Sequence, residues 1–197
     1  MGRYGYGYGM PGPLARRAWT PLQLGSSLAL WLRADLGITL NGATVSAWAD
    51  QSGNGRHAVQ AVGAAQLAYT ASGIGSMPSL TATATQNMAV PSVSTPVSGS
   101  AARTVVAVYQ PSSALGDNAI VSSGRNSLHE AFEIAALPAH DPTLTLWFDD
   151  IATAPAKTTA AKIVLASHDG ATAQTLYSNG TLVGSGAVTL NTFTSAF

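Results

Sequence analysis

The stretch KIVLASHDGATAQTLYSNGTLVGSG, residues 162–186, decides the fold class of this chain. Its apolar side chains recur with the two-residue period of a β-strand. Two turn-forming pairs, Asp169-Gly170 and Asn179-Gly180, interrupt that pattern. The stretch therefore predicts strands that follow one another through tight turns, which is how antiparallel sheets are built.

The same alternation continues in other parts of the chain. It recurs in LALWLR (28–33), RTVVAVY (103–109), HEAFEIA (129–135) and TLTLWF (143–148). In RTVVAVY apolar residues fall on both faces, so we expect Val106 and Val108 to be buried as well as Val105. Further turn pairs are Asn41-Gly42, Asn54-Gly55, Asp117-Asn118 and Asp141-Pro142. The best helical candidate is Ala58 to Leu67, but Gly63 lowers its helix propensity. Because many short alternating segments are separated by turn pairs, we expect an all-β, two-sheet sandwich.

Composition limits the classes of protein that this chain can represent. Of its 197 residues, 46% are hydrophobic and 9% are charged, against roughly 25% charged in an average soluble protein. Nine basic residues balance nine acidic ones, which argues against nucleic-acid binding because no basic field exists. The absence of cysteine excludes disulfides and zinc–thiolate sites. No apolar run reaches the ~18 residues of a membrane helix, so membrane insertion is not expected.

Residues 1–21 form a separate zone rich in Gly, Tyr and Pro, which cannot build a core. This zone is either a free tail or a docking arm. We expect a docking arm, because tyrosines offer stiff contact area and arginines offer charge. Its contact residues would be Arg3, Tyr4, Tyr6, Tyr8, Arg16 and Arg17.

The stretch WADQSGNGRHAVQ, residues 48–60, has three chemical interpretations. Residues 53–58 fit a permissive dinucleotide-binding pattern, but no apolar strand precedes them and residues 70–85 contain no acid. A hard cation such as calcium could bind at Asp50 and Asn54, although the EF-hand pattern is missing. His57 with Asp50 imitates a catalytic pair, but no nucleophile motif accompanies it. The favoured interpretation is a structural corner, in which Asp50 caps the amides of a tight turn.

The order of several motifs resembles a known superfamily. They are LALWLRADLG (28–37), VSAWADQSGNGRHAVQ (45–60), IVLASHDG (163–170) and LYSNGTLVGSG (176–186). Together they resemble the laminin-G-like, concanavalin A-like lectin/glucanase superfamily, in the form found in bacteriophage virion proteins. The resemblance covers about residues 24–190 and implies an antiparallel two-sheet jelly roll over residues 22–197.

Two departures from that superfamily matter. Its glucanases carry an E-x-D-x-x-E strand, whereas here Glu130 and Glu133 have odd spacing and no Asp between them. We therefore expect no enzymatic activity. The superfamily usually also adds one or two strands after the late hairpin, whereas this chain stops at NTFTSAF (191–197). Either the last strands are lacking, or a sheet edge is open and a neighbouring subunit completes it by strand addition.

Two functions remain open. The first is a structural protein of the extracellular phage particle (capsid decoration, head fibre or tail appendage), bound to other virion proteins or copies of itself through its arm. The second is a carbohydrate-binding, lectin-like module of a bacterial or phage surface protein, with a host-surface glycan as a candidate ligand and calcium as an optional cofactor. Its candidate contacts are Trp147, Asp149, Asp150, Tyr177 and Asn179.

Overall fold

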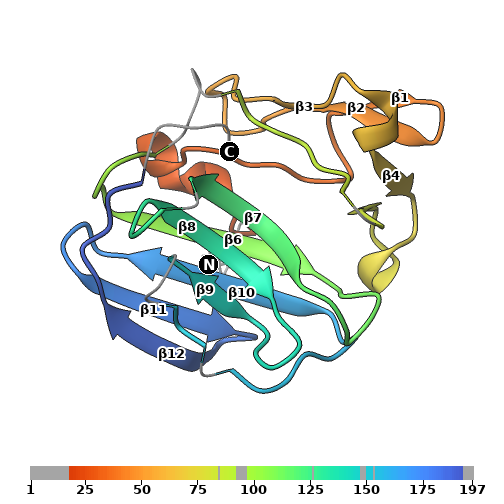
Figure 1. Cartoon of the computed structure of the whole chain (residues 1–197). Helices are drawn as coiled ribbons and strands as arrows, with labels where there is room; N and C mark the ends of the chain where they lie inside the picture. Colours follow the sequence, from red (N-terminus) through yellow and green to blue (C-terminus); the bar gives the residue numbers. More distant parts are fainter. Residues whose placement is uncertain are drawn as a thin grey trace, which may run out of the picture.

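The computed structural model describes residues 18–83, 85–91, 97–125, 127–146, 150–152 and 154–192. Most of the expected docking arm, including all six of its candidate contact residues, lies outside these ranges. The described chain is mainly β and forms three antiparallel sheets (Figure 1). The expected β class is therefore confirmed. Within the described ranges, no helix is long and apolar enough to span a bilayer.

The first sheet, here called the N-terminal sheet, has the order β1-β2-β4-β5, with β3 paired to β2. Its strands are β1 (Ile38–Asn41), β2 (Thr44–Trp48), β3 (Ala58–Val59), β4 (Leu67–Thr70) and β5 (Ser79–Thr81). Three short 3₁₀ helices accompany them: η1 (Pro21–Ser27), η2 (Gly63–Ala65) and η3 (Ile74–Ser76). The predicted turn at Asn41-Gly42 joins β1 to β2.

Two expectations fail in this region. LALWLR (28–33) is not a strand, and only an isolated bridge between Arg33 and Leu36 forms near it. The helical candidate Ala58 to Leu67 contains only β3 and one short 3₁₀ turn. In the helical candidate, strand pairing overrules the local pattern, because β2 pairs with β3 and β4 at its two ends.

The second and third sheets form a two-layer body. The four-stranded sheet has the order β12-β11-β10-β6, with β6 (Arg103–Tyr109), β10 (Lys162–His168), β11 (Ala173–Ser178) and β12 (Thr181–Ala187). The three-stranded sheet has the order β7-β8-β9, with β7 (Asn118–Gly124), β8 (Ala131–Ala136) and β9 (Thr143–Thr145). Residues 162–186 thus form three consecutive antiparallel strands, as their alternation predicts.

One hydrophobic core fills the space between these two sheets, which face each other in Figure 1. Phe132 and Ile134 enter it from β8, as expected, and Val164 and Leu176 enter it from the opposite sheet. The two-sided burial expected for β6 is wrong: Val106 and Val108 are 59% and 60% exposed. Among the described residues, a second layer packs only against the inner face of β6.

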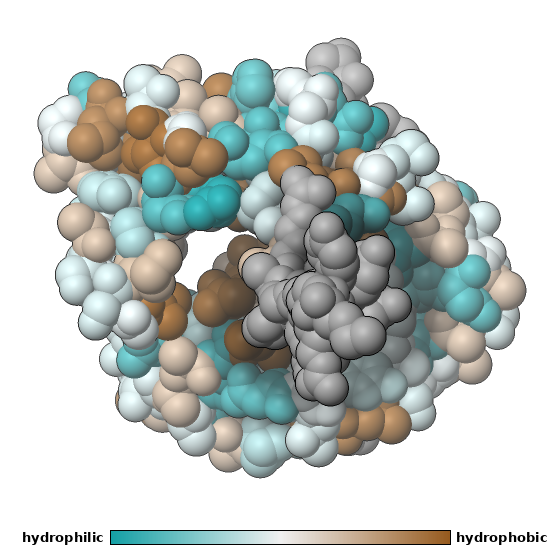
Figure 2. Space-filling model, turned by 180° about the vertical axis from the view of Figure 1, so that it is seen from behind, coloured by the Kyte–Doolittle hydropathy of each residue, from teal (hydrophilic) through white to brown (hydrophobic). Residues whose placement is uncertain are grey.

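The N-terminal sheet, in contrast, buries little apolar surface. Between residues 18 and 91, leaving residue 84 aside, the buried hydrophobic residues are Leu28, Val45, Ala58 and Val90. Exposed large apolar side chains outnumber them: Trp19, Leu22, Leu24, Leu36, Leu40, Val59, Val62 and Met77. Seen from behind, Figure 2 shows an opening between this sheet and the two-layer body, with apolar side chains beside it. This half of the chain has little core of its own.

Candidate functional site: the outer face of the four-stranded sheet

The corner at residues 48–60 is organised around the carboxylate of Asp50. This carboxylate accepts hydrogen bonds from the backbone amides of Trp31, Ser52 and Arg56 at 2.8–3.1 Å and from the Ser52 hydroxyl at 2.7 Å. Burial alone would raise the pKa of Asp50, but these hydrogen bonds outweigh it and hold the pKa below its usual value. The carboxylate therefore caps the turn, as the structural interpretation of this corner expects.

The neighbouring side chains of the corner also hold backbone. Asn54 donates through its amide nitrogen to the carbonyl of Leu28 at 2.8 Å, and Arg56 donates to the carbonyl of Ala29 at 2.7 Å. His57 accepts the backbone N–H of Asp50 through Nδ1. Within the described ranges no three His, Asp or Glu side chains cluster as a metal site would require, and calcium at Asp50 and Asn54 stays a prediction. The contacts seen here attach this corner to residues 28–31.

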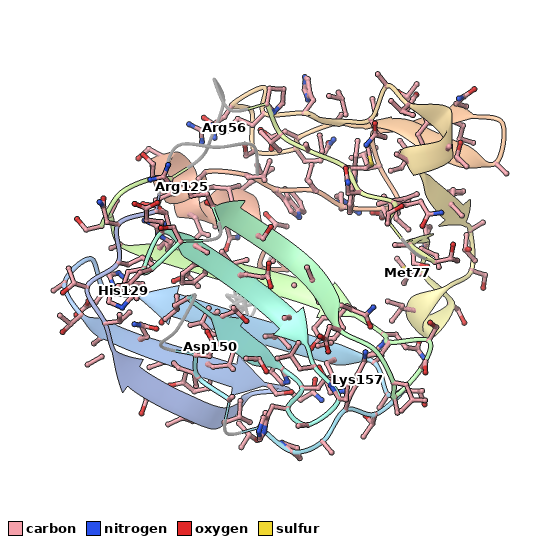
Figure 3. The ribbon with its side chains drawn as sticks, viewed as in Figure 1. Arg56, Met77, Arg125, His129, Asp150 and Lys157 are labelled. Atoms are coloured by element: carbon pink, nitrogen blue, oxygen red, sulfur yellow. The ribbon has the colours of Figure 1, made fainter. Side chains whose placement is uncertain are left out.

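The three candidate glycan-binding residues that the structure describes, Asp150, Tyr177 and Asn179, do not share one surface. Trp147 and Asp149 lie outside the described residues. Tyr177 lies on the outer face of the four-stranded sheet, where it pairs with Leu165 and Leu182 in register. Asp150 follows the three-stranded sheet, in front of the body in Figure 3, and accepts the backbone N–H of Leu146 at 2.9 Å.

Asn179 occupies the turn between β11 and β12, where its side-chain oxygen accepts the N–H of Ile163 at 2.9 Å. This hydrogen bond attaches the β11–β12 hairpin to β10. Tyr177 and Asn179 are therefore neighbours, whereas Asp150 belongs to the opposite side of the body.

The carboxylates singled out in the sequence have separate roles. Glu130 forms an exposed ion pair with Arg125. Glu133 lies on the outer face of β8, beside Ser122 and Thr145 in register. Burial raises the pKa of Glu133, and the charge of Asp150 raises it further. Glu130 and Glu133 therefore do not act as a pair.

A buried polar cluster that the sequence analysis missed lies at one end of the two-layer body. Asp141 accepts the Tyr109 hydroxyl at 2.5 Å and forms an ion pair with Lys162 at 2.8 Å. Lys162 also donates to Thr158 at 3.1 Å. All three members of the Tyr109–Asp141–Lys162 cluster are less than 9% exposed. Burial, and then the hydrogen bond to Asp141, raise the pKa of Tyr109 far above its usual range.

This cluster joins the two sheets rather than opening onto a cavity. Tyr109 ends β6, Lys162 begins β10, and Asp141 precedes β9 of the other sheet. Nearby, Lys157 donates to the Gly116 carbonyl at 2.8 Å and pins the segment before β7 (Figure 3). The one available clue was that Lys162 shares the inward phase of Val164 and Ala166 in an alternating strand.

Arg103 holds the opposite end of β6. Its guanidinium donates to the Thr192 hydroxyl at 2.7 Å and to the carbonyls of Gly99 and Ala101 at 2.6 and 3.0 Å. It also lies over the ring of Phe132, 5.7 Å from the ring centre. Burial lowers the pKa of Arg103 to about 10, so the group remains charged at neutral pH. Its partners are neutral groups on the chain's own backbone and side chains, and the arrangement ties residues 99–103 to residue 192.

The most distinctive surface is the outer face of the four-stranded sheet. Register places one residue from each strand in a cross-strand line, which we call the apolar row: Val106, Leu165, Tyr177 and Leu182. A parallel line beside it, which we call the hydroxyl row, contains Thr104, Ser167, Thr175 and Ser185. Val108 and Ile163 extend the apolar surface on the other side of the apolar row.

The outer face carries no charged side chain in these two rows. Val106, Ile163 and Leu182 are 59%, 57% and 52% exposed. In the hydroxyl row, Ser167 and Thr175 hydrogen-bond to each other at 2.7 Å, so part of the polar capacity is already satisfied within the sheet. The apolar row and its extension thus form an exposed apolar surface bordered by hydroxyl groups, and surfaces of this kind are frequent in contacts between proteins.

The comparisons with known proteins give no relative: no family model, curated protein or solved structure matches this chain.

Proposed function

We propose that this chain is a non-enzymatic structural module of a bacteriophage particle, with a jelly-roll body that an N-terminal arm anchors to other virion proteins. The resemblance of its ordered motifs to laminin-G-like modules of virion proteins supports the placement. The facing of the four- and three-stranded sheets across one core is compatible with a jelly roll.

The single observation that carries the proposal is the amount of apolar surface left uncovered in a chain with few charges. The outer face of the four-stranded sheet and the N-terminal sheet both expose large aliphatic side chains. Charged residues make up only 9% of the chain, so charge repulsion cannot keep such surfaces apart. Apolar patches of this extent mark contacts with other proteins. A particle in which many neighbours cover these surfaces satisfies this requirement.

The test is proteomic and genetic. We expect the chain in purified particles, in a fixed stoichiometry to the major capsid protein, when virions are analysed by quantitative mass spectrometry. Deletion of residues 1–21 should abolish incorporation while the circular dichroism spectrum of the remaining body is unchanged. Absence from purified particles would refute the virion assignment, and normal incorporation of the truncated chain would refute the anchoring arm.

The alternative function is carbohydrate binding, and Tyr177 is the observation that favours it. Its ring lies in the apolar row, beside the turn that contains Asn179, and sugar sites combine an aromatic ring with amide partners. A glycan array probed with and without calcium tests this function. Binding that is lost in Tyr177→Ala but kept in Leu115→Ala would support it, and an array without hits would remove it.

A further inference from the structure

We infer that two copies of this chain associate face to face through the outer faces of their four-stranded sheets. The inference deepens the proposed function and rests on it in one respect, since both require a neighbour to cover this face. It adds the identity of that neighbour, a second copy of the chain.

The apolar pattern of β6 does not match its burial. β6 alternates apolar residues on both faces, which is typical of a strand buried on two sides. The inner face meets the core, but Val106 and Val108 on the outer face remain more than half exposed. Ile163 on β10 and Leu182 on β12 repeat this situation on two more strands. Three of the four strands therefore present exposed apolar side chains typical of an interior surface, and no other described element packs over them.

The outer face of the four-stranded sheet can meet a second copy of itself without repulsion between like charges. In a twofold interface each surface meets its own copy, so any charge near the axis is placed against a like charge. The apolar row and the hydroxyl row contain no ionisable charge at neutral pH that could produce this repulsion. The formal net charge of the chain is zero, so no long-range repulsion opposes the approach of two copies. A partner chosen by charge would need a complementary patch on this face, and these rows offer none.

The outer face of the four-stranded sheet is large enough for a weak interface between two copies. Four strands about 4.8 Å apart, with residues rising about 3.3 Å each, give a face of roughly 20 by 20 Å. Two such faces cover roughly 800 Å² in projection, which is below the roughly 1,200–2,000 Å² of stable interfaces and in the range of weak, transient contacts. Stacked sheets pack about 10 Å apart with interdigitating side chains, which suits Val, Ile and Leu. We therefore expect a weak, reversible dimer with a dissociation constant of about 10–100 µM.

The experiment measures the mass of the purified full-length chain by sedimentation velocity over a range of concentrations. We expect monomer at low micromolar concentration and about twice that mass at several hundred micromolar. Val106→Lys and Leu182→Lys, which place a charge at either end of the apolar row, should each weaken association at least tenfold. Leu115→Lys is the matched control, because Leu115 is 78% exposed in the loop before β7 and lies outside the face.

Folding of each variant is checked by circular dichroism and by its unfolding midpoint. Both positions are exposed, so lysine there adds no buried charge, and two variants on different strands keep the test independent of either one. A wild-type chain that stays monomeric at the highest concentration would overturn the inference. Equal weakening by Leu115→Lys would overturn it as well, because association would then not depend on this face.

Cysteine reporters distinguish face-to-face packing from pairing at the strand edges. The chain has no cysteine, so single substitutions at Val106, Ile163 or Leu182 report only contacts between copies. Under mild oxidation we expect at least one of them to form a disulfide-linked dimer much faster than Leu115→Cys, because symmetry brings some equivalent positions together. A dimer that none of the three cross-links would indicate strand addition at the β6 or β12 edge, and would sink the face-to-face arrangement.

The outcomes separate the two proposals. A chain that dimerises through this face but is absent from particles would refute the virion assignment alone. A chain found in particles that remains monomeric in solution and whose face variants assemble normally would refute the dimer alone.

Discussion

Lys162→Met gives the sharpest test of how the two-layer body is held together. Methionine keeps the length of the aliphatic chain but removes the ammonium group that pairs with Asp141 at 2.8 Å. The side chain of Asp141 is fully buried, so its charge would be left inside the body with the Tyr109 hydroxyl as its remaining side-chain donor. Breaking a buried ion pair in this way typically costs about 3–5 kcal/mol. In a chain of this size each kcal/mol lowers the unfolding midpoint by roughly 2–4 °C, so we expect a fall of about 10 °C.

The assay is thermal unfolding of the full-length chain at pH 7, followed by circular dichroism and repeated in urea to obtain the free energy of unfolding. Arg33→Met is the matched control, because the Arg33–Asp35 ion pair is on the surface and its loss should leave the midpoint unchanged. The double variant Asp141→Leu with Lys162→Met should recover much of the loss, since no unpaired charge remains. The reasoning fails if the free energy of unfolding of Lys162→Met lies within about 1 kcal/mol of the wild-type value. It also fails if the loss of stability in the double variant equals the sum of the losses in the two single variants.

Three further outcomes are expected from stability measurements. Hydrogen bonds hold the pKa of Asp50 below its unfolded value, so its contribution to the free energy of unfolding is present above the unfolded pKa and is lost as the pH falls through the folded pKa. Measurements of unfolding at decreasing pH should show this loss of stability. Asp50→Ala should cost about 1–3 kcal/mol at pH 7 and should lose less stability as the pH falls. Burial raises the pKa of Glu133, so its charge opposes folding once the pH exceeds the unfolded pKa, and Glu133→Gln should raise the unfolding midpoint at pH 7 and not at pH 4. Glu130→Gln removes the ion-pair partner of Arg125 and should not reproduce this gain. Gly124→Ala should unfold or nearly unfold the chain, because a Cβ at this position would lie 1.9 Å from a backbone oxygen. Gly180→Ala is also at positive φ but its Cβ would enter open space, so it should cost about 1 kcal/mol. Equal losses of stability in the two variants would contradict this account.

The strands that could be predicted are those fixed by local rules. The Asp169-Gly170 and Asn179-Gly180 turns bring neighbouring alternating segments together, so β10, β11 and β12 follow directly from the sequence. LALWLR (28–33) shows the same alternation, but among the described residues it joins no strand and forms only the bridge from Arg33 to Leu36. The turn cap at Asp50 was predictable because its acceptor contacts with Ser52 and Arg56 are local.

Contacts between distant segments could not be predicted in the same way. Asp141 is 32 residues from Tyr109 and 21 from Lys162, and nothing in the pattern around Asp141-Pro142 distinguishes this acid from an ordinary turn residue. The outer face depended on register as well. Its apolar row takes one residue from each of four strands, and a shift of one residue in any strand would turn that strand's contribution inward.

The amino-acid sequence by itself determined the β class, the late hairpins and the two-sided apolar character of residues 103–109, because alternation and turn chemistry are properties of neighbouring residues. Only the tertiary structure decided which of those two apolar sides meets a core, and which buried acid meets which buried base. The physical reason is that burial and charge pairing depend on contacts between segments that are distant in the sequence, and local sequence patterns do not specify which distant segments will come into contact.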